Sequence, residues 1–192
     1  MLSTCRFAAV AALVSAVTGT QAQSLIVNGG FETPVVPVAS YQLFATGSPL
    51  GKWTVVGQAG DVAVINSQFT GGGFTYNPKA GEQFLDLTGT TRTFTGVQQR
   101  VITTPGQSYV LTFWTSNLYN NGGSSTVEVL VNGVTAMRAT NFSNAGLGQA
   151  WKLFRLQFTA PSDQTVVTFM NADPANDDAN GLDEVTMVPA TN

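Results

Sequence analysis

The amino-acid sequence predicts an all-β fold, a two-sheet antiparallel β-sandwich of the jelly-roll type. Short apolar runs are interrupted throughout by clusters of Gly, Asn, Thr and Ser, a pattern typical of short strands separated by turns. Several runs alternate apolar and polar residues with period two, and no segment after residue 22 has a useful helical period. Strands of this kind bury their apolar faces by packing two sheets together.

The alternating runs give the expected strands. Phe154, Leu156 and Phe158 should face the core, whereas Arg155 and Gln157 should face solvent. The other expected strands follow the same logic, and the full set spans residues 53–56, 61–66, 82–87, 96–102, 108–115, 126–131, 151–158, 164–170 and 182–188.

Two details refine this outline. Tyr109–Thr115 is apolar on both faces, which is typical of an interior strand. Asn132-Gly133 suits the two positive-φ positions of a type I′ hairpin turn. Residues 34–50 and 67–80 lack a clear alternation and should be loops.

The first residues resemble a secretory signal peptide. Arg6 precedes an apolar run, residues 7–17, and small residues at 18–22 suit a signal peptidase. A membrane anchor or a buried helix is the alternative, but the run is about half of the roughly 20 residues that a spanning helix needs. We therefore expect a signal peptide at 1–22 and a single domain at 23–192, secreted to the extracellular space, the periplasm or the cell surface.

Composition limits the partners and the means of stabilisation. Eight basic and 11 acidic residues give a net charge of −3, with no basic cluster, so nucleic acid and anionic membranes are not expected partners. No later segment is apolar enough to insert into a bilayer. The single cysteine, Cys5, leaves with the signal, so the mature domain must be stabilised by its core or by a metal.

The missing residue types argue against catalysis. The sequence has no histidine, which excludes Ser-His-Asp and Cys-His machinery and His-ligated metals. Two carboxylates would suffice for a glycosidase, but no pattern marks two of the acids as a facing pair. We therefore expect that the protein is not an enzyme.

Two acidic segments at opposite ends of the mature chain suggest a calcium site. They are residues 25–32 (L-I-V-N-G-G-F-E) and 180–185 (N-G-L-D-E-V). Calcium takes about six to eight oxygens from carboxylates, amides and backbone carbonyls, and glycine lets the backbone turn carbonyls toward an ion. Two ordinary surface turns are the alternative. The Asp-rich stretch 173–184 is no EF-hand, because Ala175 and Asp178 occupy its third and sixth positions.

An ordered set of motifs resembles the galactose-binding-like β-sandwiches. The set is similar to carbohydrate-binding modules of families 4, 16 and 22, and to the cell-wall-associated domain of unknown function 642 with its bacterial relatives. It covers nearly the whole mature chain. The motifs are residues 25–32, Trp53, residues 81–89 (G-E-Q-F-L-D-L-T-G), Gln98-Gln99, Trp151 and residues 181–185 (G-L-D-E-V).

The resemblance implies a jelly roll with a structural calcium away from the ligand. Glu32 and Asp183 match the acidic ligands of the family, and carbonyls near Asn28 and in residues 44–62 are expected to complete the shell. The plant branch carries cysteines that this chain lacks, so the bacterial-type sequences fit it better. The resemblance implies much less about the sugar-binding surface, and some relatives have no known ligand.

Sugar rings stack their C–H faces on aromatic side chains, so aromatics in loops or on an outer strand face are the ligand-binding candidates. For each, core packing or loop anchoring is the alternative. Trp53 and Trp151 match core positions of the family. The candidates are Phe69, Phe74, Tyr76, Trp114 and Tyr119.

The predicted function is therefore a secreted, non-catalytic carbohydrate-binding module for a cell-wall or extracellular polysaccharide, with structural calcium. The alternative is a structural or adhesive matrix or cell-surface protein without a sugar pocket. Exposed aromatics along one concave face would favour glycan binding, and a smooth polar face with one apolar patch would favour protein contact.

Overall fold

The computed structural model describes residues 22–118, 123–143, 148–173 and 179–191. Within these ranges the chain forms strands and turns, and no helix there is long and apolar enough to cross a membrane. The proposed signal segment lies almost entirely outside the described residues.

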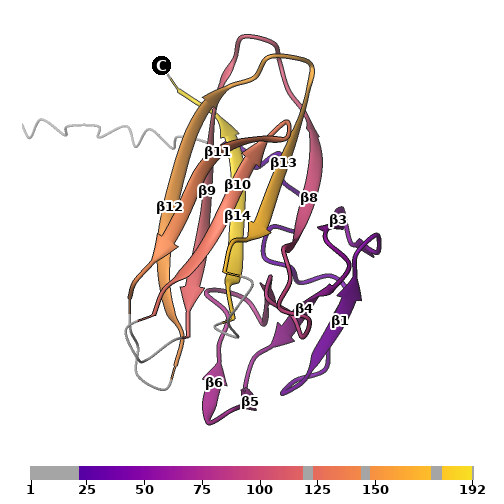
Figure 1. The fold of residues 1–192 in the computed structure, drawn as a ribbon. Helices are drawn as coiled ribbons and strands as arrows, with labels where there is room; N and C mark the ends of the chain where they lie inside the picture. Colours follow the sequence, from indigo (N-terminus) through magenta and orange to yellow (C-terminus); the bar gives the residue numbers. More distant parts are fainter. Residues whose placement is uncertain (1–21, 119–122, 144–147, 174–178, 192) are drawn as a thin grey trace, which may run out of the picture.

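Two six-stranded antiparallel sheets pack as the layers of a sandwich (Figure 1). Sheet A has the order β1-β4-β7-β14-β9-β12, and sheet B has the order β11-β10-β13-β8-β3-β2. The strands of sheet A are β1 (Tyr41–Ala45), β4 (Asp61–Asn66), β7 (Gln83–Asp86), β14 (Gly181–Pro189), β9 (Ser108–Asn117) and β12 (Ala150–Thr159). The strands of sheet B are β11 (Val134–Asn141), β10 (Ser125–Val131), β13 (Gln164–Asn171), β8 (Thr95–Ile102), β3 (Trp53–Gly57) and β2 (Pro49–Leu50).

A separate hairpin, β5 (Phe69–Gly71) and β6 (Phe74–Tyr76), lies at one end of the molecule (Figure 1). Its loop is Gly72-Gly73, with φ of +59° and +83°. Both values fit a type I′ turn, which glycine adopts without steric cost.

Aromatic rings join the two layers in the core. Trp53 of sheet B is 1% exposed and stacks on Phe31 with a centroid distance of 5.6 Å. Phe169 meets Trp53 edge-on at 6.0 Å and also meets Phe113 of sheet A edge-on at 5.0 Å. Trp53 is thus a core residue, as its match to the family's core positions implied.

The fold prediction is confirmed in its main features. Each expected strand is present with ends that differ by at most a few residues, and β9 lies between β14 and β12 as an interior strand. Phe154, Leu156 and Phe158 are partly buried, while Arg155 and Gln157 are exposed.

The expected loops were partly wrong. Residues 34–50 contain β1 and β2, and residues 67–80 contain β5 and β6, while β11 was also missed. These strands are short, or are mostly exposed as in β1 and β11, so they carry little apolar alternation. Their pairing with neighbours decides their conformation. The turn at Asn132-Gly133 has φ of +50° and +78°, as a type I′ turn requires.

The chain before β1 completes sheet A without forming a regular strand. β7 pairs with β14 only at Gly181 and Leu182. Farther along β14, Leu25 N–H donates to the Met187 carbonyl at 2.8 Å, and Val185 N–H donates to the Gly29 carbonyl at 3.0 Å. β14 therefore changes partner from β7 to the N-terminal segment, residues 24–32.

Side chains of sheet B bind the same segment from the other layer. Gln99 accepts a hydrogen bond from Val27 N–H and donates one to the Val27 carbonyl, each at 2.9 Å. Trp53 Nε1 donates to the Asn28 carbonyl at 2.9 Å. The Gln99 amide thus acts like one residue of a neighbouring strand and links the two sheets.

Replacing Gln99 by leucine should therefore destabilise the fold. Val27 would lose both partners, and we expect the free energy of unfolding to fall by about 2 kcal/mol. That corresponds to a melting temperature lower by roughly 4–8 °C. Gln98→Leu, on the opposite side of the same strand, is the matched control. Equal melting curves for both variants and the parent would contradict this role.

Candidate functional site

The outer face of sheet A, away from the core, carries a second apolar cluster. Val62, Val64 and Leu85 face the core, so their neighbours along β4 and β7 face outward. Ala63, Ile65 and Phe84 form the outward cluster, and the β5–β6 hairpin covers it with Phe69 and Tyr76.

A pocket of about 300 Å³ lies between this hairpin and the sheet. We call it the aromatic pocket. Tyr41 meets Phe69 edge-on at 5.2 Å, and Phe69 lies 5.2 Å from Tyr76, so these rings form a continuous wall. The complete lining is Tyr41, Ala63, Ile65, Phe69, Gly71, Gly72, Phe74, Tyr76, Asp86, Gly89, Thr90 and Leu118.

Asp86 and Thr90 supply polar groups to the aromatic pocket. Asp86 is 7% exposed, and its Oδ1 accepts a hydrogen bond from Thr88 N–H at 2.9 Å. Thr90 is fixed by Asp61, whose carboxylate accepts its N–H at 2.6 Å and its hydroxyl at 2.8 Å. An apolar cavity with a few fixed polar groups is the usual form of a small-ligand site.

The structure brings Phe69, Phe74 and Tyr76 together in this pocket but places Trp114 elsewhere. Trp114 is half-buried on β9, and the Lys79 ammonium lies 4.3 Å from its ring centroid in a cation–π contact. Tyr119 lies outside the described residues. Sequence reasoning missed Tyr41, Asp86 and Thr90 as pocket residues, because only the sheet register places them beside the hairpin.

Trp151 does not reach the main core. It is partly buried in the outward cluster, edge-on to Phe84 at 5.5 Å. Its Nε1 donates to the Asn77 carbonyl at 3.0 Å, and Asn77 N–H donates to Gln149 at 2.7 Å. Trp151 therefore anchors the chain that follows the hairpin.

The two predicted calcium ligands, Glu32 and Asp183, lie far apart in the sequence, yet both accept hydrogen bonds from the same turn. Glu32 Oε1 accepts hydrogen bonds from Glu82 N–H at 2.9 Å and Gln83 N–H at 3.1 Å. Gly81 has φ of +66°, and a side-chain carbon there would lie 2.0 Å from Glu32 Oε1, so glycine permits the approach.

Asp183 binds the beginning of the same turn. Its Oδ2 accepts hydrogen bonds from Lys79 N–H at 2.8 Å and Ala80 N–H at 3.2 Å. Its Oδ1 accepts one from Glu184 N–H at 2.7 Å. We call Glu32, Asp183 and the turn at residues 79–83 the carboxylate clasp. Both acids thus make contacts with a segment that is distant in the sequence.

A third carboxylate joins them through a β-bulge. The register of β14 shifts between Asp183 and Thr186, and Glu184 has φ of +50°, a value uncommon outside glycine. A side-chain carbon built on Gly30 would lie 3.3 Å from Glu184 Oε1, 3.7 Å from Asp183 Oδ1 and 3.8 Å from Glu32 Cγ. Gly30 thus leaves room for the carboxylate oxygens of Asp183 and Glu184 and for the Glu32 side chain. Sequence reasoning included Glu184 in the acidic segment 180–185 but did not single it out as a ligand, because the bulge decides its direction.

The chemistry of this donor set fits a cation. Burial raises the pKa of Asp183 to about 7, partly offset by the backbone N–H groups of Ala80, Glu184 and Lys79. No Lys or Arg side chain in the described part of the chain pairs with it. Among the described residues Glu32 accepts hydrogen bonds only through Oε1, which leaves Oε2 for an ion.

A calcium ion at the carboxylate clasp would need ligands besides the acidic side chains. The described ranges contain no group of three or more His, Cys, Asp or Glu side chains that could hold a metal by themselves. Backbone carbonyls would have to complete a calcium shell. The Asn28 carbonyl, expected to contribute, already accepts hydrogen bonds from Trp53 Nε1 and Phe31 N–H.

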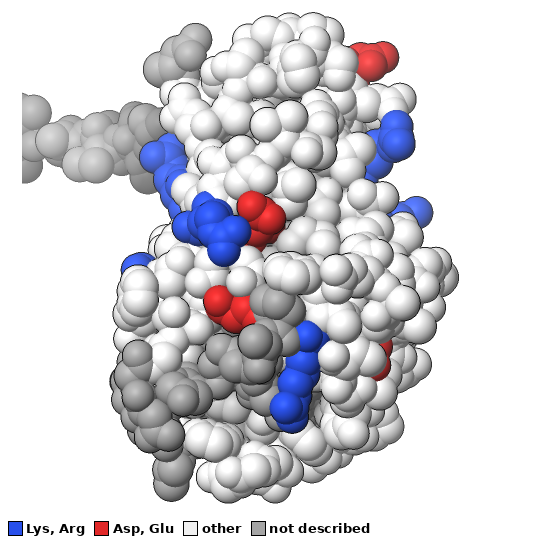
Figure 2. Space-filling view, in the orientation of Figure 1, with Lys and Arg blue, Asp and Glu red and all other residues white. Residues whose placement is uncertain are grey.

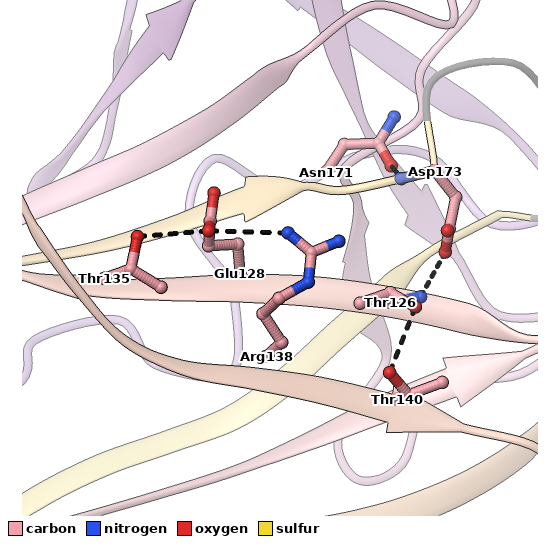
Figure 3. A network of polar contacts seen from close by, with 7 residues as sticks. All are labelled: Thr126, Glu128, Thr135, Arg138, Thr140, Asn171 and Asp173. Carbon is pink, nitrogen blue, oxygen red and sulfur yellow. Dashed lines mark hydrogen bonds and ion pairs between the residues drawn. The ribbon is translucent and has the colours of Figure 1, made fainter.

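Sheet B presents a different outer face. Arg138 pairs with Glu128 at 3.5 Å, and Thr135 donates to the same carboxylate at 3.1 Å (Figure 3). Beside them, the Thr126 and Thr140 hydroxyls lie 3.2 Å apart. Figure 2 shows charged side chains of both signs scattered over the face in view, with no patch of a single sign.

Residues 24–188 match the profile of a protein family described as a protein of unknown function, DUF642. The chain belongs to the DUF642 family. No curated protein matches the sequence.

Solved structures similar to this DUF642 chain include sugar-binding proteins. A family 35 carbohydrate-binding module from Clostridium thermocellum has 12% identity, a TM-score of 0.48, and coverage of 79% of this chain and 99% of that one. The xylan-binding family 22 module of Paenibacillus barcinonensis Xyn10C has 18% identity, a TM-score of 0.45, and coverage of 81% and 96%. The sugar-binding EclA C-terminal domain has 13% identity, a TM-score of 0.40, and coverage of 47% and 64%, so this chain spans less than two thirds of it.

Proposed function

We propose that this DUF642 protein is a non-catalytic carbohydrate-binding module that holds a sugar residue of a cell-wall or extracellular polysaccharide in the aromatic pocket. The observation that carries the proposal is the pocket itself, where Phe69, Phe74 and Tyr76 face Asp86. Aromatic walls accept the C–H faces of a sugar, and a carboxylate accepts hydrogen bonds from its hydroxyls.

The size of the aromatic pocket suits a small ligand. Its volume of about 300 Å³ is at the lower end of the range for ligand sites. A pocket of this size suits one sugar residue at the end of a chain or on a side branch.

The acids of the pocket support binding rather than hydrolysis. Among the described residues that line the pocket, Asp86 is the acidic one. A glycosidase of the common type needs a second carboxylate across the scissile bond, within about 10 Å. Asp61 accepts the hydrogen bonds of Thr90 and does not itself line the pocket, and Glu32 and Asp183 are engaged in the carboxylate clasp.

Binding should depend on the pocket aromatics. For a polysaccharide identified on a glycan array, Phe74→Ala and Tyr76→Ala should each weaken the affinity roughly tenfold, because each removes a stacking surface. Asp86→Asn should weaken it similarly through lost hydroxyl contacts. Isothermal titration calorimetry would measure the change.

Phe142→Ala is the matched control, since Phe142 is 71% exposed and does not line the pocket. The control should bind like the parent, and all variants should keep a β-rich circular dichroism spectrum. Parent-like affinity in Phe74→Ala, Tyr76→Ala and Asp86→Asn would show that the aromatic pocket is not the sugar site.

One observation favours the alternative function, adhesion or matrix structure without a sugar pocket. Val35 and Val38, which precede edge strand β1, are 82% and 61% exposed, and Tyr41 and Leu43 within β1 are 44% and 40% exposed. Exposed apolar residues on an edge strand favour protein contacts. An array without any glycan hit, together with self-association that Val35→Ser and Val38→Ser abolish, would support adhesion instead.

We also propose that calcium binds at the carboxylate clasp through Glu32 and Asp183, with Glu184 as a further ligand. The carboxylate oxygens of Asp183 and Glu184 lie near Gly30 together with the side chain of Glu32, and Asp183 is buried, which supports the proposal. A bound divalent cation would offset the charge of Asp183 and fix the N-terminal segment against β14. Its role would be structural.

Calcium at a hundredfold excess over Kd should raise the free energy of unfolding by about 2.7 kcal/mol. The melting temperature should then rise by roughly 5–10 °C relative to protein in chelator. Glu32→Gln should remove this rise, because glutamine keeps an oxygen for Glu82 and Gln83 N–H but loses the charge. Glu128→Gln, on sheet B, should keep it. A parent that melts identically in calcium and in chelator would refute the site.

Finally, we propose that the protein works outside the cytoplasm after removal of residues 1–22. The motivation is the n-region, apolar run and small-residue pattern of the sequence. In a secreting host, intact-mass analysis should find a chain that begins near residue 23. A full-length chain retained in the cells would contradict this.

A further inference from the structure

A groove of about 680 Å³ lies on the outer face of sheet A over β9, β12 and β14, and Ala22, the last residue of the proposed signal segment, lines it together with Ser24 and residues 188–191. It is separate from the aromatic pocket, which lies over β1, β4 and β7. The register aligns its side chains in rows. Arg155, Thr112 and Thr186 lie side by side on the three strands, and Gln157 begins the next row.

The side chains of this sheet A groove have a distinct chemistry. Arg155 is exposed, and none of the described residues that line the groove is acidic. No carboxylate in the described ranges pairs with Arg155. The Thr112 and Thr186 hydroxyls lie 2.5 Å apart. A guanidinium beside hydroxyl and amide groups suits an anionic ligand that also carries hydroxyls.

A second cation lies beside this row. The next row of outward-facing positions, two residues before Arg155 on β12, contains Leu153, Trp114 and Asp183. The Lys79 ammonium lies over the Trp114 ring, 4.3 Å from its centroid. Asp183 is fully buried and accepts hydrogen bonds from three backbone N–H groups, so it presents no exposed carboxylate to the groove. The overall net charge of −3 gives the protein no general attraction for polyanions, so any anion preference must be local.

The groove and the aromatic pocket share one face of the sheet. Thr112 lines the groove and Leu118, just past the end of β9, lines the pocket. Along an extended chain these positions are roughly 20 Å apart. An extended polysaccharide with one residue in the pocket would therefore reach the groove.

We propose that the sheet A groove is a second subsite, in which Arg155 binds the anionic group of a carboxylated or sulfated sugar residue of the same polysaccharide. The hydroxyls of the sugar form hydrogen bonds with Thr112, Thr186 and Gln157, and Lys79 adds positive charge at the end of the groove next to Trp114. This inference rests on the proposed carbohydrate-binding function and names its substrate class, an anionic polysaccharide.

Matched pairs of polymers test the charge requirement. The parent is titrated with polygalacturonate and with its fully methyl-esterified form, and with dextran sulfate and dextran. We expect the parent to prefer the charged member of a pair by roughly tenfold at low salt, with the preference falling as salt screens the contact. The pair that shows the preference identifies carboxylate or sulfate as the anion.

Variants assign the preference to the groove. Arg155→Gln should abolish the preference while the affinity for the neutral polymer is retained, and Lys79→Gln should reduce it. Arg138→Gln, which removes an arginine from sheet B, should leave it unchanged. A preference that survives in Arg155→Gln, or equal binding of charged and neutral polymers by the parent, overturns the subsite but leaves the aromatic pocket function intact. If the parent binds no polysaccharide of any kind, the proposed function itself fails.

Discussion

The structure depends on how the backbone hydrogen bonds of β14 are satisfied. This strand lies inside sheet A, where unpaired N–H and carbonyl groups would be buried at a cost of about 1–3 kcal/mol each. β7 covers only Gly181 and Leu182. The N-terminal segment supplies the next partners through Leu25 and Gly29. Residues 24–32 and β14 are therefore joined inside one sheet, and residues 23–192 contain no cysteine for a disulfide.

The candidate calcium site follows from this change of partner. Where β14 passes from β7 to the N-terminal segment, its register shifts, and Glu184 takes a positive φ. The shift turns Glu184 toward the space at Gly30 that Asp183 and Glu32 also border. Asp183 and Glu32 also accept hydrogen bonds from the turn at residues 79–83, so the site is part of the connection between the hairpin and β7.

That connection also organises the outer face of sheet A. The turn is fixed at one end by Trp151 through Asn77 and at the other by the carboxylate clasp. The hairpin is thereby held over Ile65 and Phe84, which forms the aromatic pocket, while Lys79 is placed over Trp114 at the end of the groove. The outer face of sheet B carries paired charges such as Glu128 and Arg138.

The sequence by itself determined the architecture, because period-two alternation and turn residues act locally. It predicted the long strands, the turn at Asn132-Gly133 and the core position of Trp53, while the calcium bridge through Glu32 and Asp183 stays a prediction. These features depend on residues that carry their own signal, either as an apolar period or as an ordered motif.

Tertiary structure alone decided which side chains meet. Glu184 joins the acids only because of a bulge, and Tyr41, Asp86 and the hairpin rings meet only because β1, β4 and β7 are neighbours in the sheet. Trp114 carries a pattern similar to that of the pocket aromatics, yet a lysine covers it. Strand order and register are long-range properties, and a single residue of register moves a side chain to the opposite face. For that physical reason the sequence indicated a binding protein, and only the folded chain brought together the residues of the candidate site.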